Sequence, residues 1–139
     1  MLWDIERHKS VATLQGDRPL RTIDVLLQSP LQETKQRLAV GDAGGWVTLW
    51  STDGERGQVV TRAKAHRAAV RRVRYLSHNL LATCGEDNLL RVWSLPDFTC
   101  IYTGNHSNFV TDVIMLPTHR LLSSGYDGTL SLHDLTGAI

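Results

Sequence analysis

The chain of 139 residues has the length of one ordinary domain, and its 42% hydrophobic and 21% charged residues are typical of a globular protein. These values exclude a disordered chain, and no apolar run approaches the roughly 18 residues needed to span a bilayer. The net charge of +1, from 15 basic and 14 acidic residues, argues against a surface that binds polyanions throughout.

The cysteines, the histidines and the N-terminal segment limit the class of protein further. The segment MLWDIERHKS does not resemble a secretory signal, and two cysteines are too few for a disulfide framework, so we expect an intracellular protein. Cys84 and Cys100 form no CxxC pair, and we expect both thiols to be buried. The six histidines show no paired metal-ligand spacing, so the sequence predicts no metal and no cofactor.

A repeat is visible in chain order. The segment LAVGDAGGWVTLW (38–50) aligns without gaps with LATCGEDNLLRVW (81–93) and LLSSGYDGTLSLH (121–133). Each segment has two apolar runs around a turn rich in Gly, Asp and Asn, a pattern that predicts a β-hairpin. A further strand is expected before each hairpin, at 20–27, 70–76 and 110–116, and fourth strands are expected in KSVATLQ, QVVTRAK and TCIYTGN.

The units recur at the spacing of four-stranded propeller blades. Trp50 and Trp93 are 43 residues apart, Trp93 and His133 are 40 apart, and Trp3 and Trp50 are 47 apart. With an LWD ending at 2–4, and with His and Asp at fixed distances before the Trp position, the chain resembles the WD-repeat family. The resemblance implies an all-β arc of roughly three four-stranded antiparallel blades. We expect one segment over 1–139, with units 5–50, 51–93 and 94–134, and with 1–4 ending a preceding blade.

The resemblance also implies a buried hydrogen-bonded set in each unit, which fixes the turn because buried polar groups need partners. In the first unit Gly16 and Gly44 replace His and Asp, so we expect this set to be absent and the turn to be softer. The two expected sets are His66, Thr83, Asp87 and Trp93, and His106, Ser123, Asp127 and His133, where His133 replaces Trp.

The second set also contains the residue types of a hydrolytic triad. Because the repeat already explains these Ser, His and Asp positions and no oxyanion site accompanies them, we expect no enzyme activity.

Three blades cannot close a ring, because radial repetition removes free sheet edges only in a complete propeller. The ring is then completed by more of the same polypeptide, by a second copy, or by another propeller protein. We expect a non-enzymatic scaffold that mediates protein–protein interactions within a multiprotein complex, and we expect no membrane contact.

The family resemblance places partner contacts on one face of the ring. Arg and aromatic residues dominate interface hot spots, and Arg pairs with acidic or phosphorylated groups. The partner-contact positions that the resemblance implies in this sequence are Arg21, Arg71, Glu86, Phe109, Thr111 and Tyr126. The alternative to a binding role is that Phe109 and Tyr126 only pack between loops.

Two other classes of partner remain open. Residues 56–74 are basic, which suggests an RNA-associated assembly factor as an alternative. The candidate phosphate contacts of such a factor are Arg62, Lys64, Arg67, Arg72 and Arg74.

The segment with Trp3, Asp4 and Arg7 suggests a different class of partner. It resembles the end of the motif by which some WD-repeat proteins act as substrate receptors of cullin-type ubiquitin ligases.

Overall fold

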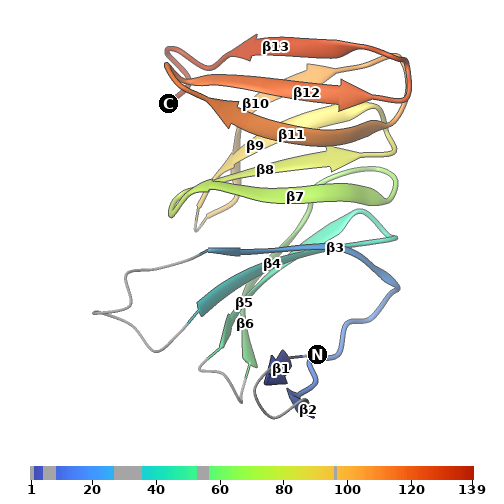
Figure 1. Ribbon diagram of the computed structural model, residues 1–139, viewed down its shortest axis with the longest axis vertical. Helices are drawn as coiled ribbons and strands as arrows, with labels where there is room; N and C mark the ends of the chain where they lie inside the picture. Colours follow the sequence, from blue (N-terminus) through green and yellow to red (C-terminus); the bar gives the residue numbers. More distant parts are fainter. Residues whose placement is uncertain (1, 5–8, 27–35, 53–56, 96) are drawn as a thin grey trace.

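The computed structural model describes residues 2–4, 9–26, 36–52, 57–95 and 97–139, and within these residues all regular structure is β-strand (Figure 1). No helix there is long and apolar enough to cross a membrane. The strands are β1 (Leu2–Asp4), β2 (Lys9–Ala12), β3 (Leu20–Leu26), β4 (Gln36–Asp42), β5 (Trp46–Thr52), β6 (Gly57–Lys64), β7 (Val70–Ser77), β8 (Leu80–Gly85), β9 (Leu89–Ser94), β10 (Thr99–Asn105), β11 (Val110–Leu116), β12 (Arg120–Gly125) and β13 (Leu130–Asp134).

The strands form antiparallel sheets in chain order, which we call blades. Blade 1 is β3-β4-β5-β6, blade 2 is β7-β8-β9-β10, and blade 3 is β11-β12-β13. A separate two-stranded sheet contains β1 and β2. The predicted all-β arc of three blades is confirmed, with the difference that the third sheet has three strands among the described residues. Each predicted repeat unit contains the outer strand of one sheet and the first three strands of the next.

Consecutive blades stack face to face, so the sheets lie one above another along the long axis of the molecule (Figure 1). Side chains alternate between the two faces of each strand, and one face therefore packs on the preceding blade and the other on the following blade. One core cluster joins blade 1 to blade 2 through Val47, Leu49, Val73, Leu81 and Trp93. A second cluster joins blade 2 to blade 3 through Leu90, Val92, Val113, Leu121 and Leu135.

The turn between β4 and β5 corrects one expectation. Gly16 and Gly44 leave blade 1 without the His–Asp pair, but Asp42 Oδ1 accepts hydrogen bonds from the amides of Gly44 (2.8 Å) and Trp46 (3.1 Å). Gly45 has φ of +87°, and a Cβ there would lie 2.1 Å from the carbonyl oxygen of His66. The expectation of a soft turn is therefore wrong, because a carboxylate two residues earlier holds the turn, including the amide of Trp46, which is equivalent to the Leu89 amide that Asp87 holds in blade 2.

Candidate partner-binding face

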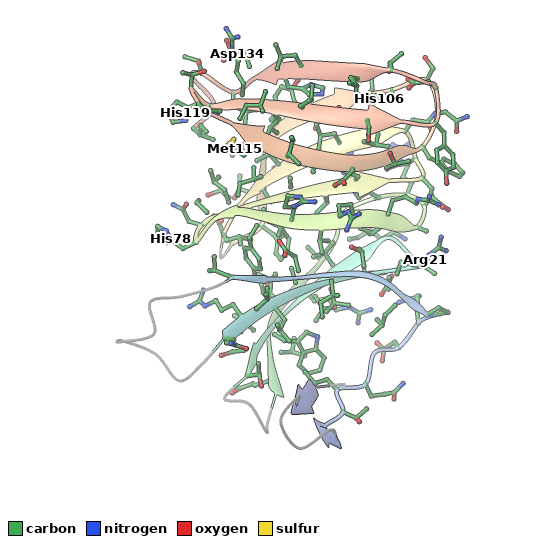
Figure 2. The ribbon with its side chains drawn as sticks, viewed as in Figure 1. Arg21, His78, His106, Met115, His119 and Asp134 are labelled. Atoms are coloured by element: carbon green, nitrogen blue, oxygen red, sulfur yellow. The ribbon has the colours of Figure 1, made fainter. Side chains whose placement is uncertain are left out.

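The loops that enter the blades and the turns between second and third strands lie together at the same end of the strands in all three blades. Figure 2 shows Arg21 at this end of the strands, whereas His78, His119 and Asp134 lie at the opposite end of the strands. A backbone hydrogen bond repeats in every blade and ties the entering loop to the turn. The donor and acceptor pairs are Ala43 and Pro19 (2.9 Å), Glu86 and Ala69 (2.8 Å), and Tyr126 and Phe109 (2.9 Å). The repeat thereby places equivalent residues of three blades on one surface.

Glu86 connects two arginines on this face. Its Oε2 lies 3.1 Å from Arg71 Nη1, within blade 2, and 3.5 Å from Arg21 Nη2 of blade 1. The side chain of Glu86 is 20% exposed, whereas that of Arg21 is 40% exposed. Two guanidinium groups therefore share one carboxylate, which leaves positive charge for a further anionic group.

Arg71 also reaches blade 3. Its Nη2 donates to the Tyr126 hydroxyl, and its guanidinium carbon lies 4.9 Å from the centre of the Tyr126 ring and 5.9 Å from that of Phe109. The two rings are 5.7 Å apart and tilted by 34°. Burial by itself would lower the pKa of Arg71, but the hydrogen bonds to Glu86 and Tyr126 outweigh it and raise the pKa. Arg71 is therefore a fixed cation between two acceptors and two aromatic rings.

Thr111 takes no part in this cluster. Its Oγ1 lies 2.8 Å from Ser124 Oγ and 3.2 Å from the Ser124 carbonyl oxygen. The predicted face thus separates into one contiguous group and one threonine that bonds within blade 3. The contiguous group, which we call the arginine–aromatic cluster, consists of Arg21, Arg71, Glu86, Phe109 and Tyr126.

The first polar set lies behind this face, in blade 2. Trp93 Nε1 donates to the Thr83 hydroxyl (2.9 Å), His66 Nε2 lies 2.8 Å from that hydroxyl, and His66 Nδ1 lies 2.9 Å from Asp87 Oδ1. Since an ionised carboxylate can only accept, a neutral imidazole leaves one order, in which His66 donates to Asp87 and Thr83 donates to His66, while the Thr83 oxygen accepts from Trp93. A Cβ at Gly85 would lie 2.4 Å from His66 Nδ1, so only glycine admits this close approach.

Asp87 receives further donors at the surface. The amides of Arg67 (3.1 Å) and Leu89 (3.2 Å) donate to its carboxylate. Burial would raise the pKa of Asp87, but these bonds and the one from His66 outweigh it and lower the pKa.

The second polar set, in blade 3, is longer. His106 Nδ1 lies 3.1 Å from Asp127 Oδ2, and the Ser123 hydroxyl lies 2.8 Å from His106 Nε2 and 2.7 Å from His133 Nε2. His133 Nδ1 then lies 2.8 Å from the Tyr102 hydroxyl on β10 of blade 2. The amide of Ser107 and the side chain of Thr129 hold the pKa of Asp127 well below its usual range. The His in the Trp position therefore extends the set into the neighbouring blade.

The order Asp127, His106, Ser123 is that of a hydrolytic triad, but the site is closed. Ser123 is 1% exposed and its hydroxyl oxygen is shared between two imidazoles, so a substrate carbonyl has no access to it in this conformation. No group of three or more His, Cys, Asp or Glu side chains in the described part of the chain is arranged to hold a metal ion.

The five candidate phosphate contacts are dispersed. Arg72 and Arg74 on β7 both bind Oδ1 of Asp112 on β11, at 3.2 and 3.1 Å, which places them at the junction of blades 2 and 3. Arg62 binds Asp17 (3.1 Å) and lies 4.6 Å from the centre of the Trp46 ring, and Lys64 lies 5.9 Å from that ring. Arg67 is exposed in the loop after His66. The basic zone of the sequence is thus divided between a blade junction and an outer strand.

The cysteines correct a further expectation. Cys84 is buried, and burial raises the pKa of its thiol strongly, as expected for an inert core residue. Cys100 is exposed on the outer strand β10, so the expectation that both thiols are buried is wrong. An outer strand has no following strand to cover it, which explains the difference.

Sequence reasoning missed three residues of this region. Asp42 caps its turn from a position two residues before the usual Asp, Asp112 joins two arginines of blade 2, and Tyr102 extends the blade 3 set. Asp42 was detectable as the one carboxylate in the GDAGG turn. The other two depend on which side chains of separate blades meet.

These stacked sheets with repeated His–Asp turns define the chain as an arc of a β-propeller. The family model for "WD domain, G-beta repeat" matches residues 57–94 and 98–134, which is more than half of the chain, so the chain belongs to the WD-repeat family. A crystal structure of the computationally designed Ika8 protein has the same fold, with a TM-score of 0.68 and 17% identity over 92% of this chain and 37% of that one.

Curated relatives are much longer than this chain. WD repeat-containing protein JIP5 of Laccaria bicolor is 33% identical over 86 residues, which are 60% of this chain and 20% of that protein. Ribosome biogenesis protein ytm1 of Pyrenophora tritici-repentis is 28% identical over 88% of this chain and 28% of its own length. Human DDB1- and CUL4-associated factor 10 is 31% identical over 55% of this chain and 14% of its own length. The chain thus spans less than a third of each of these relatives.

Proposed function

We propose that this chain is a non-enzymatic WD-repeat scaffold whose arginine–aromatic cluster binds a protein segment with acidic or phosphorylated groups. The observation that carries the proposal is the position of Arg71, which joins Glu86 to Tyr126 and faces two aromatic rings. Arg, Tyr and Phe together provide charge, apolar area and rigidity, the properties of an interface hot spot. The intracellular location expected from the sequence stays a prediction.

Glu86 sets the conditions for binding. A ligand phosphate or carboxylate competes with the Glu86 carboxylate for Arg21 and Arg71. A singly charged ligand carboxylate therefore gains little binding free energy, and a doubly charged phosphate gains most. A planar guanidinium presents paired donors to such a group, while the rings of Phe109 and Tyr126 pack on neighbouring apolar side chains of the ligand.

The test uses a peptide library in matched pairs, in which one position is serine or phosphoserine. We expect the phosphorylated member of a pair to bind more tightly, and we expect Arg71→Glu to weaken binding by about tenfold or more. Arg120→Glu is the control, because it makes the same change of charge on an exposed residue at the start of β12, at the opposite end of the strands from the arginine–aromatic cluster. Equal binding of both members, or equal loss in both variants, would contradict the proposal.

A second candidate is a substrate receptor of a cullin-type ubiquitin ligase. The relative named DDB1- and CUL4-associated factor 10 supports it. The side chains of the WDIER segment lie outside the described residues, so the structure gives this candidate no geometry. Purified DDB1 mixed with the chain should co-elute from a sizing column, and separate elution would remove this candidate.

RNA binding is the remaining alternative. Its support is the pair Arg62 and Lys64 beside Trp46, an arrangement that fits a stacked base and a backbone phosphate. Arg72 and Arg74 are instead paired with Asp112. A single-stranded oligonucleotide that binds with a salt-dependent affinity lost in Arg62→Glu would support RNA, and no binding at low salt would exclude it.

A further inference from the structure

The first strands of the three blades lie next to one another, with β7 between β3 and β11 (Figure 1). Side chains of β3 bond directly to the backbone of β7: Thr22 Oγ1 accepts from the Val73 amide (3.3 Å), and Asp24 Oδ2 accepts from the Tyr75 amide (2.7 Å). Because β7 is an edge strand of its sheet, these amides have no strand to pair with. First strands that contact one another across blades lie nearest the central channel about which propeller blades are arranged.

The junction of blades 2 and 3 has hydrogen-bond donors where the first junction has acceptors. The register of the first two strands places Arg72 at the position of Thr22, and Arg74 at the position of Asp24. A guanidinium group can donate hydrogen bonds but cannot accept them. Blade 2 therefore cannot cap the edge amides of β11 in the way that blade 1 caps those of β7.

A single carboxylate, that of Asp112, serves the donors at this junction. Its Oδ1 lies 2.8 Å from the Val113 amide, 3.1 Å from Arg74 Nη2 and 3.2 Å from Arg72 Nε. Three donors thus converge on one oxygen, which has only two lone pairs. The buried Nε groups of both arginines complete no hydrogen bond within the described part of the chain. Donors therefore outnumber acceptors at the inner edge of this junction.

The backbone amide of Met115 adds a further donor. It is the equivalent of the Tyr75 amide, because both residues pair with the second residue of the next strand. The Val113 amide points away from β12, and alternate residues of an antiparallel strand point the same way, so the Met115 amide also points away from β12. No side chain among the described residues accepts from it. Arg72, Arg74 and the Met115 amide form what we call the inner donor group.

We infer that the inner donor group binds the phosphate group of a small molecule on the channel side of blades 2 and 3. Two guanidinium charges meet only one carboxylate here, so positive charge is left for an anion. A phosphate group presents three acceptor oxygens, one for each member of the inner donor group, whereas a planar carboxylate presents two. The side chains of Arg72 and Arg74 are 41% and 36% exposed, so a ligand can reach them.

The inner donor group lies inside the arc and is separate from the arginine–aromatic cluster. The junction that holds it is packed on both sides by the second core cluster, and a blade added to either end of the arc would stack on blade 1 or blade 3 instead. Arg71 is adjacent to Arg72 in the sequence, but it reaches Glu86 and Tyr126 at the end of the strands. The two groups can therefore be tested independently.

The test is a titration of the purified, nitrogen-15-labelled chain with inorganic phosphate at neutral pH, followed by nuclear magnetic resonance. We expect saturable shifts of the Met115 amide signal and of the Arg74 Nε–H signal. Arg74→Gln should weaken phosphate binding by about tenfold or more, because it removes one of the two charged donors. Arg120→Gln is the matched control, since Arg120 is exposed at the start of β12 and belongs to neither group.

Asp112→Asn should change the affinity in the opposite direction. The amide oxygen of Asn can still accept from the Val113 amide, but the variant removes the negative charge that competes with phosphate for both arginines. We expect phosphate to bind about tenfold more tightly. A purely structural role of these residues would give no gain of affinity, so this variant also carries the test if circular dichroism shows that Arg74→Gln does not fold.

Sodium chloride at the same ionic strength separates binding from charge screening. Shifts at Met115 that phosphate causes and chloride does not, with higher affinity in Asp112→Asn, support the inference. Equal shifts with chloride overturn it, as does the absence of any saturable shift. Phosphate shifts confined to Arg21, Arg71 and Tyr126 also overturn it and place the anion on the arginine–aromatic cluster. Unchanged or weaker phosphate binding in Asp112→Asn overturns it equally.

Discussion

The hydroxyl of Tyr102, on the outer strand of blade 2, lies 2.8 Å from Nδ1 of His133, on the third strand of blade 3. The rings meet edge to face, with centres 5.6 Å apart. With both imidazoles neutral, every hydrogen bond of the set can point the same way: Tyr102 donates to His133, His133 to Ser123, Ser123 to His106, and His106 to Asp127. Aligned donors polarise one another, so the series joins two blades through a continuous polar contact.

Tyr102→Phe should lower the free energy of unfolding by about 1 kcal/mol, because it leaves Nδ1 of a buried His133 without its donor. Urea denaturation followed by circular dichroism measures this change. Tyr75→Phe is the matched control, since the buried Tyr75 hydroxyl has no hydrogen-bond partner among the described residues. Burial raises the pKa of Tyr75 to about 12, which is consistent with a neutral, isolated hydroxyl. Equal losses in both variants would argue against a structural role for the Tyr102–His133 bond.

His133 should make the protein less stable in mild acid. Burial, together with the nearby His106, lowers the pKa of His133 below its ordinary value of 6.5. The unfolded chain therefore binds more protons than the folded chain as the pH falls below 6.5, and the free energy of unfolding decreases in that window. Urea midpoints at about pH 7.5 and 5.5 should show this loss.

His133→Trp separates this effect from the titration of other groups. Trp does not titrate and occupies the equivalent positions 50 and 93, so the variant should lose less stability between the two pH values than the natural chain. A separate loss is expected only below about pH 3.8, where Asp87, Asp127 and Asp134 take up protons, because the pKa of each is lowered in the folded state. An unchanged pH dependence in the Trp variant would contradict the assignment to His133.

Asp87→Ala should destabilise the chain by about 2–3 kcal/mol. The variant removes an acceptor for His66 Nδ1 and for the amides of Arg67 and Leu89, and it leaves the imidazole of His66, which is only 2% exposed, with an unpaired N–H. Thermal unfolding measures the change. Asp97→Ala is the control, because the exposed Asp97 accepts, within the part of the chain that the structure describes, a bond from the nearby Thr99 hydroxyl alone, and should change the stability by less than about 0.5 kcal/mol.

The two cysteines should react at very different rates with a thiol reagent such as Ellman's reagent. One equivalent should react at once in the native protein, from the exposed Cys100, and the second only after denaturant is added, from the buried Cys84. The raised pKa of the Cys84 thiol keeps it protonated and unreactive. Cys100→Ser should abolish the rapid phase. A rapid phase that persists would mean that the junction of blades 2 and 3 opens.

The sequence by itself determined the strands and the order of the blades. Strand alternation, Gly and Asp turns and a period near 40 residues are local properties, so the predicted strands at 20–27, 70–76 and 110–116 differ from β3, β7 and β11 by no more than one residue at an end. The position of the polar sets also follows from spacing, because a His and an Asp 21 residues apart meet whenever the blade forms.

Only the tertiary structure decided which side chains meet between blades. Arg71 reaches Tyr126 across 55 residues, Tyr102 reaches His133 across 31, and Asp112 binds two arginines of the preceding blade. The exposure of Cys100 depends in the same way on what lies beside an edge. A repeat specifies each blade through contacts within it, whereas these contacts depend on the relative position of separate sheets, for which a single sequence carries no periodic signal.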